Sequence, residues 1–98
     1  MPKESIKERP EAKIKLPKRY KVLMYNDDYT TMEFVTLVLM KIFDKDQEEA
    51  KRLMLAIHQS TYAVVGVYTR DIARTKVNSA TDWARKCGFP LKIEAVEE

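Results

Sequence analysis

Asn26, Asp27 and Asp28 place an amide and two carboxylates in one short turn between two apolar segments. Thr30 adds a hydroxyl two residues further along. Oxygen acceptors and negative charge at a strand-to-helix junction suggest a site for a small cation, and His58, the only histidine, could complete it. The same residue types are also common in turns and helix caps, where acids complement the helix dipole. A cation site and an ordinary cap both remain open at this point.

Other kinds of chemistry find little support. One histidine and one cysteine, Cys87, cannot make an ordinary zinc site, and Asp27, Asp28 and His58 alone are a weak signal for a metal. A hydrolase would need a Gly-x-Ser-x-Gly elbow or a second histidine, and the sequence has neither. With two glycines the chain lacks the usual phosphate-binding loop. We expect no enzymatic activity, no metal and no cofactor, so a hydrolase or metalloenzyme is the weaker alternative.

Length and composition limit the class of protein. The 98 residues have room for one domain with a modest core. Hydrophobic residues make up 45% and charged residues 34%, which is ordinary for a soluble globular protein. No apolar run approaches the roughly 18 residues needed to cross a bilayer, and the polar N-terminus has no signal-peptide core. The sequence therefore predicts a cytoplasmic protein without a membrane partner.

The net charge of +3 is divided unevenly along the chain. Residues 1–21 hold eight Lys or Arg and three Glu, which gives +5, whereas residues 22–98 hold ten basic and twelve acidic residues, which gives −2. Two prolines, few apolar residues and mixed charge predict a flexible basic arm over 1–19 and a core domain over 20–98. A nucleic-acid-binding arm is the alternative, but its interleaved acids favour a solvated leader, so no nucleic acid partner is expected.

The core domain is predicted to begin with an apolar strand over 20–26. Thr30 and Glu33 have the Thr-x-x-Glu spacing of a capping box, which predicts that a helix begins there. Nine of the twelve positions from Met32 to Phe43 are apolar, more than one amphipathic face requires. We therefore expect this helix to be central or to line a pocket.

A second helix is predicted to begin at Asp46, where the capping pattern is repeated with Glu49. Its apolar residues fall at i, i+3, i+4 and i+7 and form one core-facing stripe. They are Ala50, Leu53, Met54 and Ile57. His58 lies four residues beyond Met54, so the two side chains should be neighbours at the edge of that stripe.

The remaining elements are predicted from β-prone runs and helix stop signals. A strand is expected over 62–68, followed by a helix that Thr69 caps and that Gly88 ends. A short last strand is expected over 91–95, where apolar and charged residues alternate. The order β-α-α-β-α-β predicts an α+β fold in which helices pack on a small three-stranded antiparallel sheet.

Seven segments of this domain resemble those of the ClpS family, the adaptors that deliver N-degron substrates to a Clp protease in bacteria and plastids. The segments are Tyr20-Lys21-Val22-Leu23, Asn26-Asp27-Asp28-Tyr29-Thr30, Met32-Glu33-Phe34-Val35, Met54-Leu55-Ala56-Ile57-His58, Gly66-Val67-Tyr68-Thr69, Thr75-Lys76-Val77 and Pro90-Leu91. They occur in the family's order and spacing over about residues 20–95. The resemblance implies the β-α-α-β-α-β fold that also occurs in the C-terminal domain of the ribosomal stalk protein.

The resemblance further implies an adaptor that binds the free N-terminus of substrates beginning with Leu, Phe, Tyr or Trp. A free α-amino group has a pKa of about 7.7–8.0, so near pH 7 it is mostly a cation with three donors. By resemblance its acceptors are Asn26, Asp28 and His58, and Asp27 adds negative potential or binds the peptide backbone. Because His58 must be neutral at the accepting nitrogen, binding should weaken as the imidazole protonates.

The first side chain of the substrate is expected to enter an apolar pocket. By resemblance its lining is Met24, Tyr25, Thr30, Met32, Val35, Met54, Ile57 and Leu91. Met32 resembles the family's gatekeeper, whose bulk disfavours Ile and Val at the first position. Met24 and Tyr25 stand where smaller aliphatic residues are more usual, which affects the expected shape of the pocket.

Delivery to the protease implies a second surface. By resemblance Asp71 and Lys76, on or beside the third helix, contact the N-terminal domain of a ClpA- or ClpC-type AAA+ unfoldase. The arm over 1–19 resembles the extension that the unfoldase engages during hand-off. Asp71 also fits an ordinary helix N-terminus, and Lys76 fits a solvated helix face. A monomer in a bacterial cytoplasm is the expected state.

Overall fold

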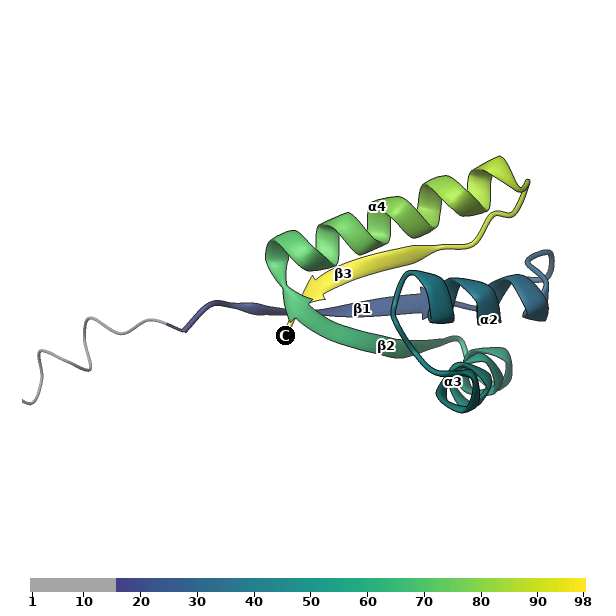
Figure 1. Ribbon diagram of the computed structural model, residues 1–98, viewed down its shortest axis with the longest axis horizontal. Helices are drawn as coiled ribbons and strands as arrows, with labels where there is room; N and C mark the ends of the chain where they lie inside the picture. Colours follow the sequence, from purple (N-terminus) through teal and green to yellow (C-terminus); the bar gives the residue numbers. More distant parts are fainter. Residues whose placement is uncertain (1–15) are drawn as a thin grey trace, which may run out of the picture.

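The computed structural model describes residues 16–98, so the predicted arm over 1–19 lies outside the described residues except for its last four. Within the described part, three strands and three helices follow one another (Figure 1). In chain order they are β1 (Arg19–Tyr25), α2 (Met32–Lys41), α3 (Gln47–Gln59), β2 (Tyr62–Thr69), α4 (Arg70–Lys86) and β3 (Ile93–Glu97). The predicted order β-α-α-β-α-β is confirmed.

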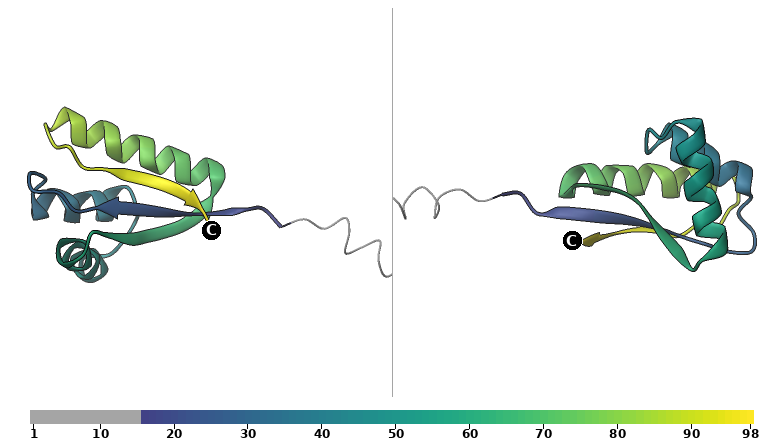
Figure 2. Two further views of the ribbon diagram at one scale, coloured as in Figure 1. Left: turned by 180° about the vertical axis from the view of Figure 1, so that it is seen from behind. Right: turned by 90° about the horizontal axis from the view of Figure 1, so that it is seen from below.

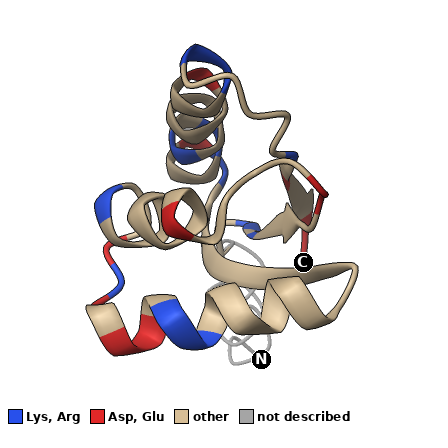
Figure 3. Ribbon diagram, turned by 90° about the vertical axis from the view of Figure 1, so that its right-hand side faces the viewer, with Lys and Arg blue, Asp and Glu red and all other residues tan. Residues whose placement is uncertain are grey.

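The strand β1 lies in the middle of the sheet, and both of its neighbours, β2 and β3, run antiparallel to it. It begins at Arg19, one residue before the predicted start, because Arg19 pairs with Thr69. At the opposite end of the sheet, Tyr25 pairs with Tyr62. The three helices lie on one side of the strands (Figure 2 and Figure 3), as the predicted α+β fold requires.

The helix α2, which the sequence predicts to be central or to line a pocket, buries four of its residues in the core. The ring centroid of its Phe34 lies 5.1 Å from that of Trp83 and 4.9 Å from that of Phe89, which ties α2 to the end of α4. The largest fully buried side chains of the domain are Phe43, Met24, Leu39, Leu91, Val22, Val38 and Val65. In the described part of the chain, no helix combines the length and apolarity needed to span a bilayer.

The start of α2 differs by one residue from the prediction. Thr31, and not Thr30, is the N-cap, because its hydroxyl accepts the N–H of Phe34 at 3.1 Å. The hydroxyl of Thr30 is turned the other way and donates to Asp27 at 2.7 Å. Two adjacent threonines offer the same capping chemistry, and the contact with Asp27 decides which of them caps the helix.

The other helix ends follow the sequence more closely. Asp46 caps α3 as predicted, since its carboxylate accepts the N–H of Glu49 at 2.8 Å. Gly88 follows α4 with φ of 84°, a conformation that suits glycine and ends the helix. Thr69 occupies the N-cap of α4, but its side chain makes no capping hydrogen bond. The last strand begins at Ile93, two residues later than predicted.

Candidate functional site

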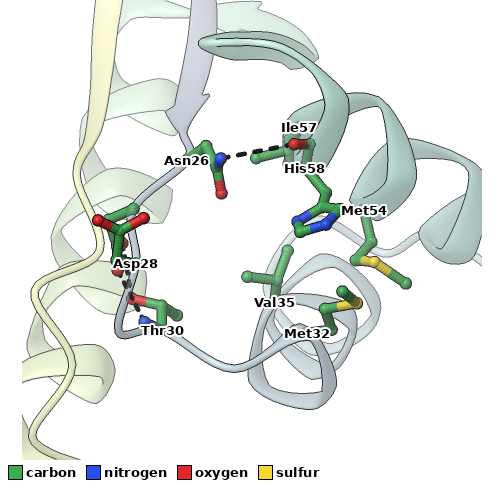
Figure 4. A pocket seen from close by; sticks show the side chains of 9 residues that line it. Asn26, Asp28, Thr30, Met32, Val35, Met54, Ile57 and His58 are labelled. Atoms are coloured by element: carbon green, nitrogen blue, oxygen red, sulfur yellow. Dashed lines mark hydrogen bonds between the residues drawn. The ribbon is translucent and has the colours of Figure 1, made fainter.

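A cavity of about 290 Å³ opens between the turn after β1 and the helices α2 and α3 (Figure 4). Its lining residues are Asn26, Asp27, Asp28, Thr30, Met32, Val35, Met54, Ile57 and His58. All nine were proposed from the sequence. Sites for drug-sized molecules usually measure roughly 300–1,000 Å³, so this cavity suits a group of about the size of one side chain.

The lining of the cavity has an apolar part that two helices provide. Met32 and Val35 come from α2, and Met54 and Ile57 come from α3. Val35 and Ile57 are buried in the core, whereas Met32 is 44% exposed and stands at the rim. Thioethers are flexible and polarizable, so the methionines can adapt to apolar groups of different shape.

Asn26 presents an acceptor to the cavity. Its Nδ2 donates to the backbone oxygen of His58 at 3.5 Å, and its backbone N–H donates to the oxygen of Thr61 at 3.0 Å. These two contacts tie the turn to the C-terminal end of α3. With Nδ2 turned toward α3, the Oδ1 atom points into the cavity (Figure 4). The side-chain amide is therefore oriented as a hydrogen-bond acceptor for a ligand.

Asp28 and His58 complete the polar part from opposite sides. Asp28 lies in the turn and His58 in the last turn of α3, and both are exposed. Figure 4 shows the ring of His58 beside Met54 on the cavity side. With Asn26, a carboxylate, an amide oxygen and an imidazole surround the mouth of an apolar cavity. This arrangement can bind a cation that carries several N–H donors next to an apolar group.

Asp27 is engaged inside the turn. Its Oδ1 accepts the N–H of Tyr29 at 2.8 Å and that of Thr30 at 2.7 Å, and its Oδ2 accepts the Thr30 hydroxyl at 2.7 Å. Burial raises the pKa of the Asp27 carboxyl, but the hydrogen bonds from Thr30 and Tyr29 and the charge of Arg85 outweigh it, so the pKa is lowered. The carboxylate is therefore ionised throughout the neutral range.

This lowered pKa predicts how Asp27 contributes to stability as the pH changes. Because the folded state favours the ionised form, the contribution is present above the unfolded pKa of about 3.9 and is lost as the pH falls through the lower folded pKa. We expect Asp27→Asn to reduce the free energy of unfolding by about 1 kcal/mol or less at pH 7, and by a smaller amount at pH 3. Urea unfolding of both proteins at the two pH values measures the difference. If the difference in the free energy of unfolding between wild type and Asp27→Asn were as large at pH 3 as at pH 7, the expectation would be contradicted.

Arg85 is a contributor that the sequence did not single out. Its Nη1 donates to the backbone oxygens of Phe89 and Leu91, each at 2.9 Å. These bonds hold the loop after α4 against the end of the helix. A basic residue in the last turn of a helix, three residues before Gly88, is the signal that could have indicated this role.

Three residues that the resemblance places in the pocket lining are not among the nine that line the cavity, and their part in the lining stays a prediction. Met24 is 0% and Leu91 1% exposed, and both belong to the hydrophobic core. Tyr25 follows Met24 in β1 and so faces the opposite side of the sheet, where its hydroxyl donates to Glu94 and its ring packs on Tyr62. Among residues 16–98, no three His, Cys, Asp or Glu side chains gather to hold a metal ion.

The two predicted docking residues differ in their surroundings. Asp71 is exposed in the first turn of α4. The side chain of Lys76 is only 19% exposed, which corrects the expectation of a solvated face. Its Nζ donates to the backbone oxygen of Ile42 at 2.7 Å and to Asp44 at 3.3 Å, and it lies 5.3 Å from the ring centroid of Tyr68. Lys76 therefore fastens α4 to the end of α2.

Residues 15–94 match the family described as ATP-dependent Clp protease adaptor protein ClpS. The chain belongs to the ClpS family. The ClpS adapter protein of Lawsonia intracellularis is 51% identical over 90 residues, which cover 90% of this chain and 83% of that protein. The ClpS adapter protein of Burkholderia mallei strain SAVP1 is 50% identical over 88 residues, which cover 90% of this chain and 85% of its own.

A solved ClpS structure shares the fold. Agrobacterium tumefaciens ClpS2, bound to L-phenylalaninamide, superimposes with a TM-score of 0.82 at 46% identity, covering 85% of this chain and 100% of that one. The resemblance inferred from the motifs and the predicted fold are both confirmed. As a ClpS protein, this chain is an adaptor of the ATP-dependent Clp protease.

Proposed function

We propose that this ClpS adaptor binds the free N-terminus of polypeptides that begin with Leu, Phe, Tyr or Trp and delivers them to the AAA+ unfoldase of the Clp protease. The observation that carries the proposal is the cavity, in which polar acceptors surround the mouth of an apolar space. A bulky first residue has the matching parts, an ammonium beside an apolar side chain. L-Phenylalaninamide, the ligand of the Agrobacterium protein, has the same two parts.

The ammonium supplies three donors to the three acceptors at the cavity mouth. We assign these donors to the Asn26 Oδ1 atom, the Asp28 carboxylate and the neutral imidazole of His58. Each hydrogen bond to a charged group contributes about 1.5–3 kcal/mol, and burial of a Leu or Phe side chain contributes about 1.5–3 kcal/mol. After the costs of association, micromolar affinity is expected, about −8 kcal/mol. Such affinity suits an adaptor that must release its cargo.

Met32 is expected to select against β-branched first residues. Its half-exposed side chain stands at the rim of the cavity, where a branch at Cβ would meet it close to the peptide backbone. Wild-type protein should bind Leu and Phe peptides about tenfold or more tighter than Val and Ile peptides, a difference of about 1.4 kcal/mol. Met32→Ala should remove most of that difference. Fluorescence anisotropy with otherwise identical labelled peptides measures the four affinities.

Leu37→Ala is the matched control for this experiment. Leu37 belongs to the same helix and is 43% exposed, but it is not among the cavity-lining residues. The Leu37→Ala substitution should leave the preference for Leu peptides over Val peptides unchanged. If Met32→Ala gains nothing for Val and Ile, selectivity depends on other residues. If peptides that begin with Ser bind as tightly as Leu peptides, the proposed apolar pocket is wrong.

Delivery requires that the adaptor hold substrate and unfoldase at the same time. We assign docking to the start of α4, where Asp71 is exposed and Ile72 is 49% exposed. This surface follows the end of the sheet where Arg19 pairs with Thr69 (Figure 1). The cavity is lined by the turn that follows the other end of β1. An unfoldase domain bound at the start of α4 would therefore leave the cavity open.

A further inference from the structure

Two adjacent carboxylates of the turn have different surroundings. An ionised carboxylate offers about four lone-pair positions to donors. Asp27 already receives three hydrogen bonds, from the N–H groups of Tyr29 and Thr30 and from the Thr30 hydroxyl. Asp28 is exposed at the cavity and lies inside the loop that these bonds close. Asp27 therefore has little capacity left for a ligand, whereas Asp28 lies on backbone that the bonds of its neighbour fix.

We infer that Asp27 is a positioning residue, which fixes the turn that presents Asn26 and Asp28 to the ligand's ammonium without binding the ammonium itself. The inference rests on the proposed function and deepens it. A side-chain oxygen bonded to the N–H groups two and three residues ahead fixes the backbone between them. That backbone includes Asp28, so the main chain that carries its carboxylate is held in place before a peptide arrives. The third bond also orients the Thr30 side chain against the cavity.

A second set of hydrogen bonds connects the start of this turn to α4. Arg85 holds the loop after α4 through the oxygens of Phe89 and Leu91. The next oxygen along that loop, on Lys92, accepts the N–H of Tyr25 at 3.0 Å, one residue before Asn26. The loop is therefore bonded both to α4 and to the end of β1. Arg85 also lines a second cavity together with Tyr29, which places the guanidinium beside the turn.

Asparagine and alanine at position 27 separate positioning from direct charge contact. Asn keeps an oxygen that can accept the two N–H groups, and its amide can donate to the Thr30 hydroxyl. Ala keeps neither, and both substitutions remove the same negative charge. If Asp27 acts by positioning, Asp27→Asn should retain most of the affinity that Asp27→Ala loses. If the Asp27 charge contacts the ammonium directly, Asp27→Asn should lose as much affinity as Asp28→Asn.

The experiment measures the affinity for a labelled Leu peptide in four variants. We expect Asp27→Asn to bind within about threefold of wild type, and Asp27→Ala to bind about 5- to 30-fold more weakly, as for a lost cap. Asp28→Asn should lose roughly 10- to 100-fold, as for a hydrogen bond to a charged group. Glu48→Gln removes an exposed charge in the first turn of α3 and is the matched control, with unchanged affinity.

Amide hydrogen exchange at Tyr29 and Thr30 gives a second readout. Protection should persist in Asp27→Asn and fall in Asp27→Ala. The inference is overturned if Asp27→Asn loses as much affinity as Asp28→Asn, or if Asp27→Ala binds as well as Asp27→Asn. A different result, wild-type protein binding Leu and acetyl-Leu peptides equally, would overturn the proposed function itself. The two failures are therefore distinguishable within one set of titrations.

Discussion

A peptide that begins with Leu is expected to bind at least about 100-fold more tightly than the same peptide with an acetylated first residue. Acetylation removes the positive charge and two of the three donors of the ammonium. At least two acceptors among Asn26, Asp28 and His58 then lose their partner. Two hydrogen bonds to a charged group contribute about 3–6 kcal/mol together, which corresponds to a factor of more than 100.

Titration of both labelled peptides by fluorescence anisotropy checks this expectation. The matched control uses Asp28→Asn, in which one charged acceptor is already missing. Acetylation should therefore cost that variant about tenfold less than it costs wild type, because the two changes remove the same interaction. Equal binding of the two peptides by wild-type protein would contradict the assignment of the turn to an ammonium. If acetylation weakened binding as much in Asp28→Asn as in wild type, the contact with the charged amine would belong to a residue other than Asp28.

The requirement for both charge and shape explains how a small cavity can be selective. An internal Leu has the apolar side chain but no ammonium, and an N-terminal Ser has the ammonium but leaves the apolar space unfilled. Each alone provides only part of the roughly 8 kcal/mol expected for the complete ligand. The ammonium contacts therefore restrict binding to free N-termini. The apolar lining, which includes Met32 and Met54, selects among the possible first residues.

Much of the fold was predictable because it depends on local patterns. The surplus of apolar positions in α2 predicted a helix that is central or lines a pocket, and Phe34 and Val35 are buried. The spacing of Met54 and His58 predicted neighbours on α3, and both line the cavity. The residues of the turn after β1 also lie where the motif predicted. These predictions concern residues that are close together in the sequence, so their relative positions follow from the local backbone and do not depend on contacts with distant elements.

The contacts that were missed connect elements far apart in the sequence. Lys76 was expected on a solvated face because helical spacing says nothing about Ile42, whose oxygen accepts from its ammonium. Leu91, which the resemblance places in the pocket lining, is buried in the core, and its backbone oxygen accepts from Arg85. Each outcome depends on a tertiary hydrogen bond or on packing that no local pattern encodes.

Replacing Lys76 by Met is expected to lower the free energy of unfolding by about 1.5–3 kcal/mol, the usual value of a hydrogen bond to a charged group. The ammonium is held by the Ile42 oxygen at 2.7 Å, and the substitution would leave that oxygen without its partner. Its contact with Asp44 adds little, because the Asp44 side chain is 81% exposed and water screens the pair. The nearby ring of Tyr68 adds a cation–π attraction.

Urea unfolding measures the loss. Arg74→Met, a substitution at an exposed position of the same helix, is the matched control and should stay within about 0.5 kcal/mol of wild type.

The result also bears on docking to the unfoldase. Asp71→Ala should weaken binding to the unfoldase N-terminal domain with little change in stability, because Asp71 is exposed. Lys76→Met should weaken docking only together with stability, since its ammonium already bonds within the domain. A Lys76 variant of full stability that fails to bind would show that its ammonium contacts the unfoldase directly.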